Sequence, residues 1–153
     1  VYKRQVIRNA VIALFSLFIF SGCSGPMGPI AGGELEGAPI DWPSDWTYTN
    51  DIENVLLETD PMDPYSVTIW IVVADGVPYI AAGDGESRWA RNIMENPNII
   101  LSVDGKLIRA HASQVVVEEE IFRVAAQYVD KYEMEQEDFV EEEDGVLFRL
   151  SPR

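Results

Sequence analysis

The segment from Gly83 to Leu101 restricts the fold more than any other part of the chain, because it carries signals for both ends of a short helix. Ser87 is a residue type that is favoured at helix starts, where its hydroxyl can cap free amides. Pro97 disfavours the helical conformation in the residue before it. The sequence therefore predicts a helix from Ser87 to Asn96, placed between two strands.

The start of this helix combines several groups that favour bound anions. Backbone N–H groups are free in the first turn of any helix, and they point toward an anion such as phosphate. Ser87 adds a hydroxyl, and Arg88 and Arg91 add two guanidinium groups that pair well with phosphate oxygens. The pattern indicates a candidate phosphate site.

A second interpretation needs no ligand. Trp89 and Ile93 are four residues apart and share one helix face, so they can pack into a core while the other residues face solvent. Asp84 and Glu86 place negative charge beside the candidate site and oppose anion binding. In this interpretation the segment is a surface helix that crosses between two strands.

Charge and rare residues exclude several function classes. The chain has 153 residues, a length typical of one domain, and a formal net charge of -15. Such a charge repels nucleic acid and anionic lipid headgroups, so we expect neither as a partner. One cysteine and one histidine exclude an intrachain disulfide, a thiolate zinc site and a cluster of several histidine ligands. Calcium binding by carboxylates alone stays open, but no calcium-loop motif supports it, so we assign no metal ligands.

The first residues have the pattern of an export signal. Lys3, Arg4 and Arg8 precede an apolar run over residues 10–20, which is too short to span a bilayer comfortably. The ending Phe-Ser-Gly-Cys at 20–23 resembles the lipobox of bacterial lipoproteins, which implies that Cys23 is acylated, for example with palmitate, and becomes the first residue. The alternative is an uncleaved membrane anchor with an incidental cysteine.

The predicted organisation has three parts. Residues 1–22 form the signal peptide, 23–50 the lipidated cysteine and a tether rich in glycine and proline, and 51–153 the folded domain. Within the second part, Trp42, Trp46 and Tyr48 can pack over the edge of the domain or bind a partner. Ser24, where lipoproteins kept in the inner membrane usually have aspartate, favours an outer-membrane anchor that faces the periplasm.

The folded part consists mainly of strands joined by tight turns. Strands are predicted over 54–59, 66–74, 77–82, 98–103, 106–117 and 146–150 from their β-branched and apolar residues. Asp-Gly pairs at 75–76, 104–105 and 144–145 predict hairpin turns. The strand over 66–74 is apolar on both faces, so one face needs a cover, either a helix or a second subunit.

Two further features complete the pattern. The strand over 106–117 places Arg109, His111 and Ser113 on one side, which can border a ligand groove or simply face water. Residues 118–134 show helical spacing of apolar side chains, and the acidic stretch over 133–144 reads as a solvated loop. The predicted fold class is α+β: an antiparallel split β-barrel with one short crossing helix and one longer C-terminal amphipathic helix.

The order of elements resembles the FMN-binding split β-barrel superfamily, which includes pyridoxamine 5′-phosphate oxidases and deazaflavin-dependent nitroreductases. The residues that carry the resemblance are Trp89, Asn92, Ile93, Asn96 and Pro97, spaced as W-x-x-N-I-x-x-N-P. Ser87 and Arg88 are similar to the first two residues of the Ser-Arg-Lys phosphate motif of the oxidases.

The resemblance implies a homodimer with FMN or a deazaflavin at the subunit interface. By position, Ser87 and Arg88 would hold the phosphate, with Arg91 nearby, and Trp89 and Asn92 would shape the adjoining wall. The third motif position is Trp89 where the oxidases have lysine, which argues against pyridoxamine phosphate oxidation.

Two functions remain open from the sequence. One is a flavin- or deazaflavin-dependent oxidoreductase on the bacterial envelope, which transfers a hydride to a small organic substrate through chemistry that the cofactor supplies. The other is a non-catalytic lipoprotein whose barrel acts as a ligand-binding or interaction module. Haem capture is a third possibility, for which His111 is the only evident axial ligand.

Overall fold

The computed structural model describes residues 24–134 and 145–153. The predicted signal peptide, Cys23, and residues 135–144 of the predicted acidic loop lie outside the described residues. The elements are β1 (Ala38–Ile40), the 3₁₀ helix η2 (Thr47–Asp51), β2 (Val55–Thr59), β3 (Tyr65–Ile69), β4 (Val72–Ala74), β5 (Val77–Ala82), α2 (Arg88–Glu95), β6 (Asn98–Val103), β7 (Lys106–Gln114), α3 (Glu118–Tyr132) and β8 (Val146–Pro152).

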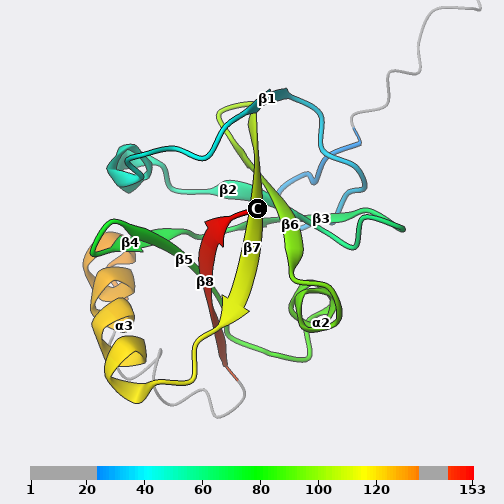
Figure 1. Cartoon of the computed structure of the whole chain (residues 1–153). Coiled ribbons are helices and arrows are strands. Elements are labelled where there is room, and N and C mark those ends of the chain that lie inside the picture. Colours follow the sequence, from blue (N-terminus) through cyan, green and yellow to red (C-terminus); the bar gives the residue numbers. More distant parts are fainter. Residues whose placement is uncertain (1–23, 135–144) are drawn as a thin grey trace, which may run out of the picture.

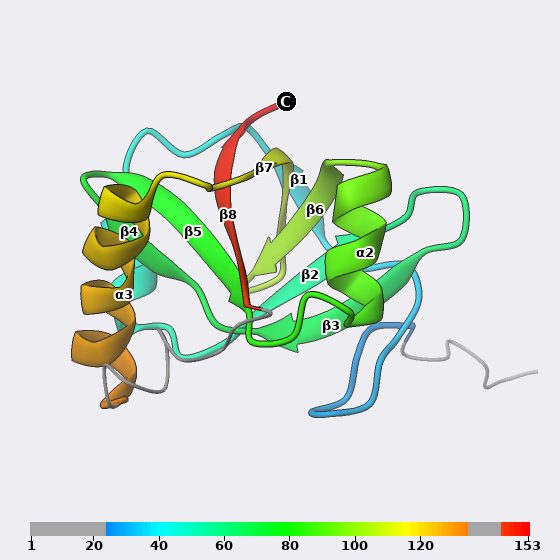
Figure 2. The same cartoon turned by 90° about the horizontal axis from the view of Figure 1, so that it is seen from below.

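The strands form one curled antiparallel sheet in the order β3-β2-β6-β7-β8-β5-β4, and β1 adds to β7 in parallel. Figures 1 and 2 show the sheet curling into an open barrel, with α3 on one side and α2 on the other. The two end strands of this order, β3 and β4, follow each other directly in the chain. The predicted α+β split barrel, with a short crossing helix and a longer C-terminal helix, is confirmed.

Most local predictions are confirmed. Helix α2 has Ser87 and Asn96 as its flanking residues, and β5 and β6 have the predicted bounds. Both described Asp-Gly turns have positive φ at each residue, 52° and 78° at Asp75 and Gly76. The strand over 106–117 is shorter than predicted, because β7 ends at Gln114.

The prediction of one strand over 66–74 is wrong, because the chain turns a corner after Ile69. The first part, β3, pairs with β2, and the second part, β4, pairs with β5. Trp70 and Ile71 lie between them, at the split of the barrel. A continuous apolar run predicts strand conformation but cannot show that two parts of the run pair with different neighbours.

The end of α3 closes this split. The hydroxyl of Tyr132 accepts a hydrogen bond from the Ile71 N–H at 3.1 Å, and it lies 3.0 Å from the Ile71 carbonyl and 2.9 Å from that of Glu53. The Lys131 ammonium donates to the carbonyls of Ile71 and Thr49, at 2.7 and 2.8 Å. Backbone groups that leave the strand ladder at the corner are thus satisfied by side chains of α3.

We expect Tyr132→Phe to lower the free energy of unfolding by about 1–2 kcal/mol, because the change leaves the Ile71 N–H without its acceptor. Urea unfolding followed by circular dichroism measures this loss. Tyr48→Phe is the control, since Tyr48 is 42% exposed and its hydroxyl takes part in none of the corner hydrogen bonds given above. An equal effect of the two changes would contradict a specific role for the Tyr132 hydroxyl.

The segment before β2 contacts the barrel at several points. Gly32 exchanges two backbone hydrogen bonds with Ser66 on β3. The Leu35 N–H donates to the buried Glu58 carboxylate at 2.6 Å. Trp46 is only 1% exposed and belongs to the main core, so the packing alternative holds for this residue.

Two apolar clusters hold the helices to the sheet. The main core fills the barrel and includes Trp89, Ala90 and Ile93 from α2. A second cluster lies between α3 and the strands β4, β5 and β8, with Val124 and Tyr128 as its fully buried helix residues. Helix α3 thus covers Val72 and Ala74, so a helix, one of the two predicted covers, covers the β4 part of the apolar run. In the described part of the chain, no helix has both the length and the apolar character needed to cross a membrane.

Candidate functional site

Two adjoining hollows lie where β5 ends. They share Trp70 and the three residues 81–83, so they adjoin each other with Trp70 at the junction, and we refer to the pair as the depression. We call them the α3 hollow and the α2 hollow, after the helix that borders each. Ligand sites in proteins are usually concave and mostly apolar, so this depression is the candidate site.

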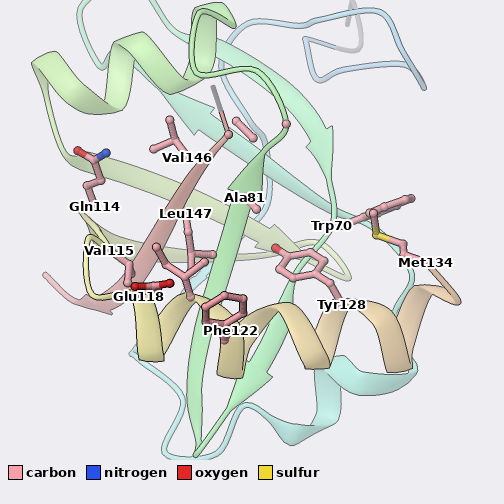
Figure 3. A pocket seen from close by; sticks show the side chains of 14 residues that line it. Trp70, Ala81, Gln114, Val115, Glu118, Phe122, Tyr128, Met134, Val146 and Leu147 are labelled. Carbon is pink, nitrogen blue, oxygen red and sulfur yellow. The ribbon is translucent and has the colours of Figure 1, made fainter. Parts of the chain in front are cut away.

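The α3 hollow has a volume of about 440 Å³. Figure 3 shows Phe122 and Tyr128 reaching from α3 toward the strands, with Gln114 and Glu118 at one end of the hollow and Trp70 and Met134 at the other. Most of the lining is apolar. The lining residues are Trp70, Ala81, Ala82, Gly83, Gln114, Val115, Glu118, Ile121, Phe122, Tyr128, Met134, Gly145, Val146 and Leu147.

The α2 hollow has a volume of about 290 Å³ and is more polar. It lies between the corner of the barrel and the start of α2. Its lining residues are Asn54, Thr68, Ile69, Trp70, Ala81, Ala82, Gly83, Asp84, Ser87 and Trp89.

Ser87 is the one predicted site residue with an unused polar group in this depression. Its hydroxyl does not cap α2, so the expectation of a side-chain cap is wrong. The Oγ atom is buried and has no hydrogen-bond partner in the described structure. Buried hydroxyls are normally paired, so an orphan at the edge of a hollow indicates a place for a ligand group or a water.

Arg88 is engaged elsewhere. Its Nη2 donates to the Asp63 carboxylate at 3.0 Å, and its guanidinium lies 4.3 Å from the centre of the Tyr65 ring. Asp63 belongs to the turn between β2 and β3, and Arg88 is not among the lining residues of either hollow. A guanidinium held by a carboxylate and an aromatic face is less available to a phosphate.

The other three predicted residues differ in their surroundings. Trp89 is 9% exposed, lies 6.0 Å from the Phe148 ring, and lines the α2 hollow. Asn92 points inward and donates to the Thr59 hydroxyl at 3.0 Å. The Arg91 side chain is 58% exposed and lies 3.9 Å from a Glu86 oxygen. Of the five predicted residues, only Ser87 and Trp89 line the depression.

Trp70 was missed as a site residue by sequence reasoning. Its ring stacks on Tyr132, with centroids 4.4 Å apart and planes 11° from parallel, and 42% of the residue is exposed. A tryptophan in a strongly apolar run is more simply assigned to the core. Phe122, which is 42% exposed, was also missed, because it is not on the apolar helix face that the spacing over 118–134 predicts.

The charges around the depression are acidic. Asp84 lines the α2 hollow and Glu118 lines the α3 hollow, and neither lining contains a lysine or an arginine. Burial raises the pKa of Tyr128, so its phenol stays protonated at neutral pH. The site therefore favours uncharged or cationic groups over a dianion.

His111 stands apart from this depression. It lies on β7, paired with Asn98 on β6 and Ser151 on β8, and is absent from the lining of both hollows. Its neighbours Arg109 and Ser113 are exposed, so the predicted polar row is present on that face of β7. Over residues 24–134 and 145–153, no cluster of three or more histidine, cysteine or acidic residues could hold a metal ion.

No protein-family model matches the sequence, and no curated protein matches it. Solved structures resemble the fold. The haem storage protein HutZ of Vibrio cholerae is 21% identical, with a TM-score of 0.56 over 70% of this chain and 86% of its own. The hypothetical protein Rv2991 of Mycobacterium tuberculosis is 19% identical, with a TM-score of 0.55 over 70% and 77%.

A proposed pyridoxamine 5′-phosphate oxidase of Listeria innocua is 16% identical, with a TM-score of 0.54 over 70% of this chain and 89% of its own. Likenesses at this level of identity establish the architecture, which is that of the pyridoxamine 5′-phosphate oxidase type of split barrel. They do not carry a function with them, because one fold supports many functions.

Proposed function

We propose that this domain binds one flat ring molecule of the flavin class across the two hollows. The ring system lies in the α3 hollow and its polar side chain reaches the α2 hollow. The observation that carries the proposal is the junction at Trp70, where an apolar hollow of about 440 Å³ meets a polar one that contains the unpaired Ser87 hydroxyl. This volume is typical of sites for small cofactors.

The residues present fit the ring and the sugar-like side chain of a flavin better than its phosphate. The Ser87 hydroxyl and the first amides of α2 can bond to hydroxyl groups of a ligand. The predicted phosphate ligand Arg88 is held by Asp63, and Asp84 adds negative charge beside the same place. FMN is therefore expected to bind with about the same affinity as riboflavin, because its phosphate adds little. A deazaflavin is expected to bind in the same way, through its ring and side-chain hydroxyl groups.

A bound flavin or deazaflavin would supply hydride transfer to a small organic substrate. The residues of the chain would position the ring and exclude water, with Trp70, Phe122 and Leu147 as apolar walls. The alternative is a non-catalytic binding module with the same site. Steady-state reduction of a small quinone or nitro compound by the loaded protein, with a reduced nicotinamide added as the two-electron donor, separates the two.

Anchorage and assembly complete the proposal. Acylation of Cys23 would hold the domain at the bacterial envelope, with the outer membrane facing the periplasm as the favoured location.

Val116 and Val117 are 77% and 56% exposed and follow Val115, which lines the α3 hollow. Such an apolar border supports a homodimer in which a second copy covers this edge.

Haem is the second candidate ligand, because HutZ stores haem and Met134 places a thioether at one end of the α3 hollow. His111 lies outside both hollows, so Met134 is the axial ligand that this site offers.

The test is a titration of the purified chain with riboflavin, FMN and haemin, followed by visible absorbance and thermal stability. Binding of riboflavin and FMN with similar affinity would support the proposal. Haemin binding that Met134→Ala abolishes would favour the second candidate. A chain that shows neither a spectral change nor a thermal shift with any of the three would refute ligand binding of this kind.

We expect Trp70→Ala to weaken riboflavin binding at least tenfold, about 1.4 kcal/mol, because the ligand loses the wall shared by the two hollows. Tyr48→Ala is the matched control, since Tyr48 is equally exposed at 42% and lies outside both linings. Isothermal titration of the two variants makes the comparison. Unchanged affinity in Trp70→Ala would move the site away from the junction.

A further inference from the structure

The first described residues, 24–34, form a small hairpin that is held by its own hydrogen bonds. Met27 and Ile30 exchange two backbone hydrogen bonds at 2.9 and 3.0 Å, and the Gly33 N–H donates to the Ser24 carbonyl at 2.6 Å. Gly28 provides the positive φ of 57° that the turn needs. A Cβ atom at Gly32 would collide with the backbone of Gly25, so the two arms cross very closely.

The hairpin is fixed to the domain at its base. Gly32 exchanges two backbone hydrogen bonds with Ser66, at 2.8 and 2.9 Å, and Ser66 lies on the edge strand β3. Leu35, directly after the hairpin, is only 6% exposed. The tip therefore has a set direction relative to the barrel, and Figure 2 shows the hairpin projecting below β3, away from the barrel.

The tip is apolar and exposed in a chain that is otherwise highly charged. Met27 and Ile30 are 66% and 67% exposed, and as directly paired residues they share one face of the hairpin. Residues 24–33 contain no charged side chain, and Glu34 is the first charge after the predicted signal. Burying this tip in a lipid surface would therefore desolvate no ion.

The hairpin also begins at the predicted anchor. Ser24, its first residue, is bonded to Cys23, and three residues of extended chain span only about 10 Å between Ser24 and Met27. An acylated Cys23 would hold the tip within reach of the lipid headgroups.

We infer that the tip of hairpin 24–34 is a second membrane contact, through which Met27 and Ile30 enter the lipid surface beside the acyl anchor. The inference rests on the anchored location given under the proposed function. An acyl chain alone leaves a domain free to rotate, whereas an anchor plus a rigid apolar tip fixes its orientation.

The methionines of the chain allow a direct test. The processed chain from Cys23 is coupled through its only thiol to a maleimide phospholipid in phosphatidylcholine vesicles. A charged oxidant that does not cross membranes is added, and mass spectrometry follows sulfoxide formation at each methionine. We expect oxidation of Met27 to slow about fivefold on coupling, because sulfur in the lipid surface is shielded. Met62 and Met94, 92% and 56% exposed, are internal references and should not change.

Ile30→Glu supplies the variant, and Met62→Glu is its matched control. A charge at the tip should restore the oxidation rate of Met27 to that of the uncoupled chain, whereas the same charge at the β2–β3 turn should leave the protection intact. Equal oxidation of Met27 in coupled and uncoupled wild-type chain would overturn the inference. Acylation itself is tested separately, by the mass of the protein recovered from membranes, so failure of the anchor and failure of the tip give different results.

Discussion

Replacing Trp46 with alanine should lower the free energy of unfolding by about 3–5 kcal/mol, which is a large part of the stability of a small domain. Trp46 is 1% exposed and is among the largest fully buried side chains of the core. Its ring packs against Trp42 at a tilt of 56° with the centroids 4.8 Å apart, and it stacks on Tyr48 at 6.1 Å. Its carbonyl accepts the hydroxyl of Thr49 at 2.8 Å. Removal of the ring would leave a cavity at the barrel wall.

Denaturant unfolding of the processed chain measures this effect, with Trp70→Ala as a control for loss of a half-exposed tryptophan. The same experiment tests the predicted domain boundary at residue 51. If Trp46→Ala costs several kcal/mol, a chain that starts at residue 51 should not fold stably, and the segment 23–50 belongs to the domain. A loss below that of Trp70→Ala would show that the segment is a dispensable tether.

Local signals made much of this fold predictable. Alternation of buried and exposed residues along β7, as at Ile108, Arg109 and Ala110, follows directly from strand geometry. The Asp-Gly turns and the stop at Pro97 depend only on backbone preferences of neighbouring residues. These signals depend only on residues a few positions apart, so they can be recognised in the sequence alone.

Contacts between distant segments were not predictable in the same way. Arg88 was predicted to be a phosphate ligand from its neighbours in sequence. In the structure it pairs instead with Asp63, which lies 25 positions earlier. Trp70 belongs to an apolar run that predicted one continuous strand, but the chain turns at the split and leaves Trp70 42% exposed. In both cases the outcome depends on tertiary packing rather than on local pattern.

Glu120→Ala is expected to destabilise the domain by about 2–3 kcal/mol, because it breaks a buried network under α3. The carboxylate of Glu120 accepts the Tyr79 hydroxyl at 2.8 Å and Arg149 Nε at 2.9 Å, and a second bond joins Arg149 Nη2 to its other oxygen. Glu120 is 7% exposed, whereas the Arg149 side chain is 47% exposed. Arg149 can therefore regain water in the variant, which keeps the loss below that of a fully buried pair.

Chemical unfolding at pH 7 checks this value, and Glu119→Ala is the control on the exposed side of the same turn. Glu120→Leu combined with Arg149→Met should recover part of the loss, because no charge is then left without its partner. A double variant as unstable as Glu120→Ala alone would mean that the cost comes from packing rather than from the ion pair.

The same network predicts how stability depends on pH. The hydrogen bond from Arg149, followed by that from Tyr79, holds the pKa of Glu120 below its ordinary value, against the opposing effect of burial. An acid with a lowered pKa in the folded state stabilises the fold above its unfolded pKa, about 4.3, and this contribution is lost as the pH falls through the folded value.

The difference in the free energy of unfolding between wild type and Glu120→Ala should therefore narrow below about pH 4. A gap that stays constant from pH 7 to strongly acidic solution would contradict an ionised Glu120 beneath α3. Because α3 forms one wall of the proposed site, the same acid range should also release a bound ring ligand from the wild-type chain.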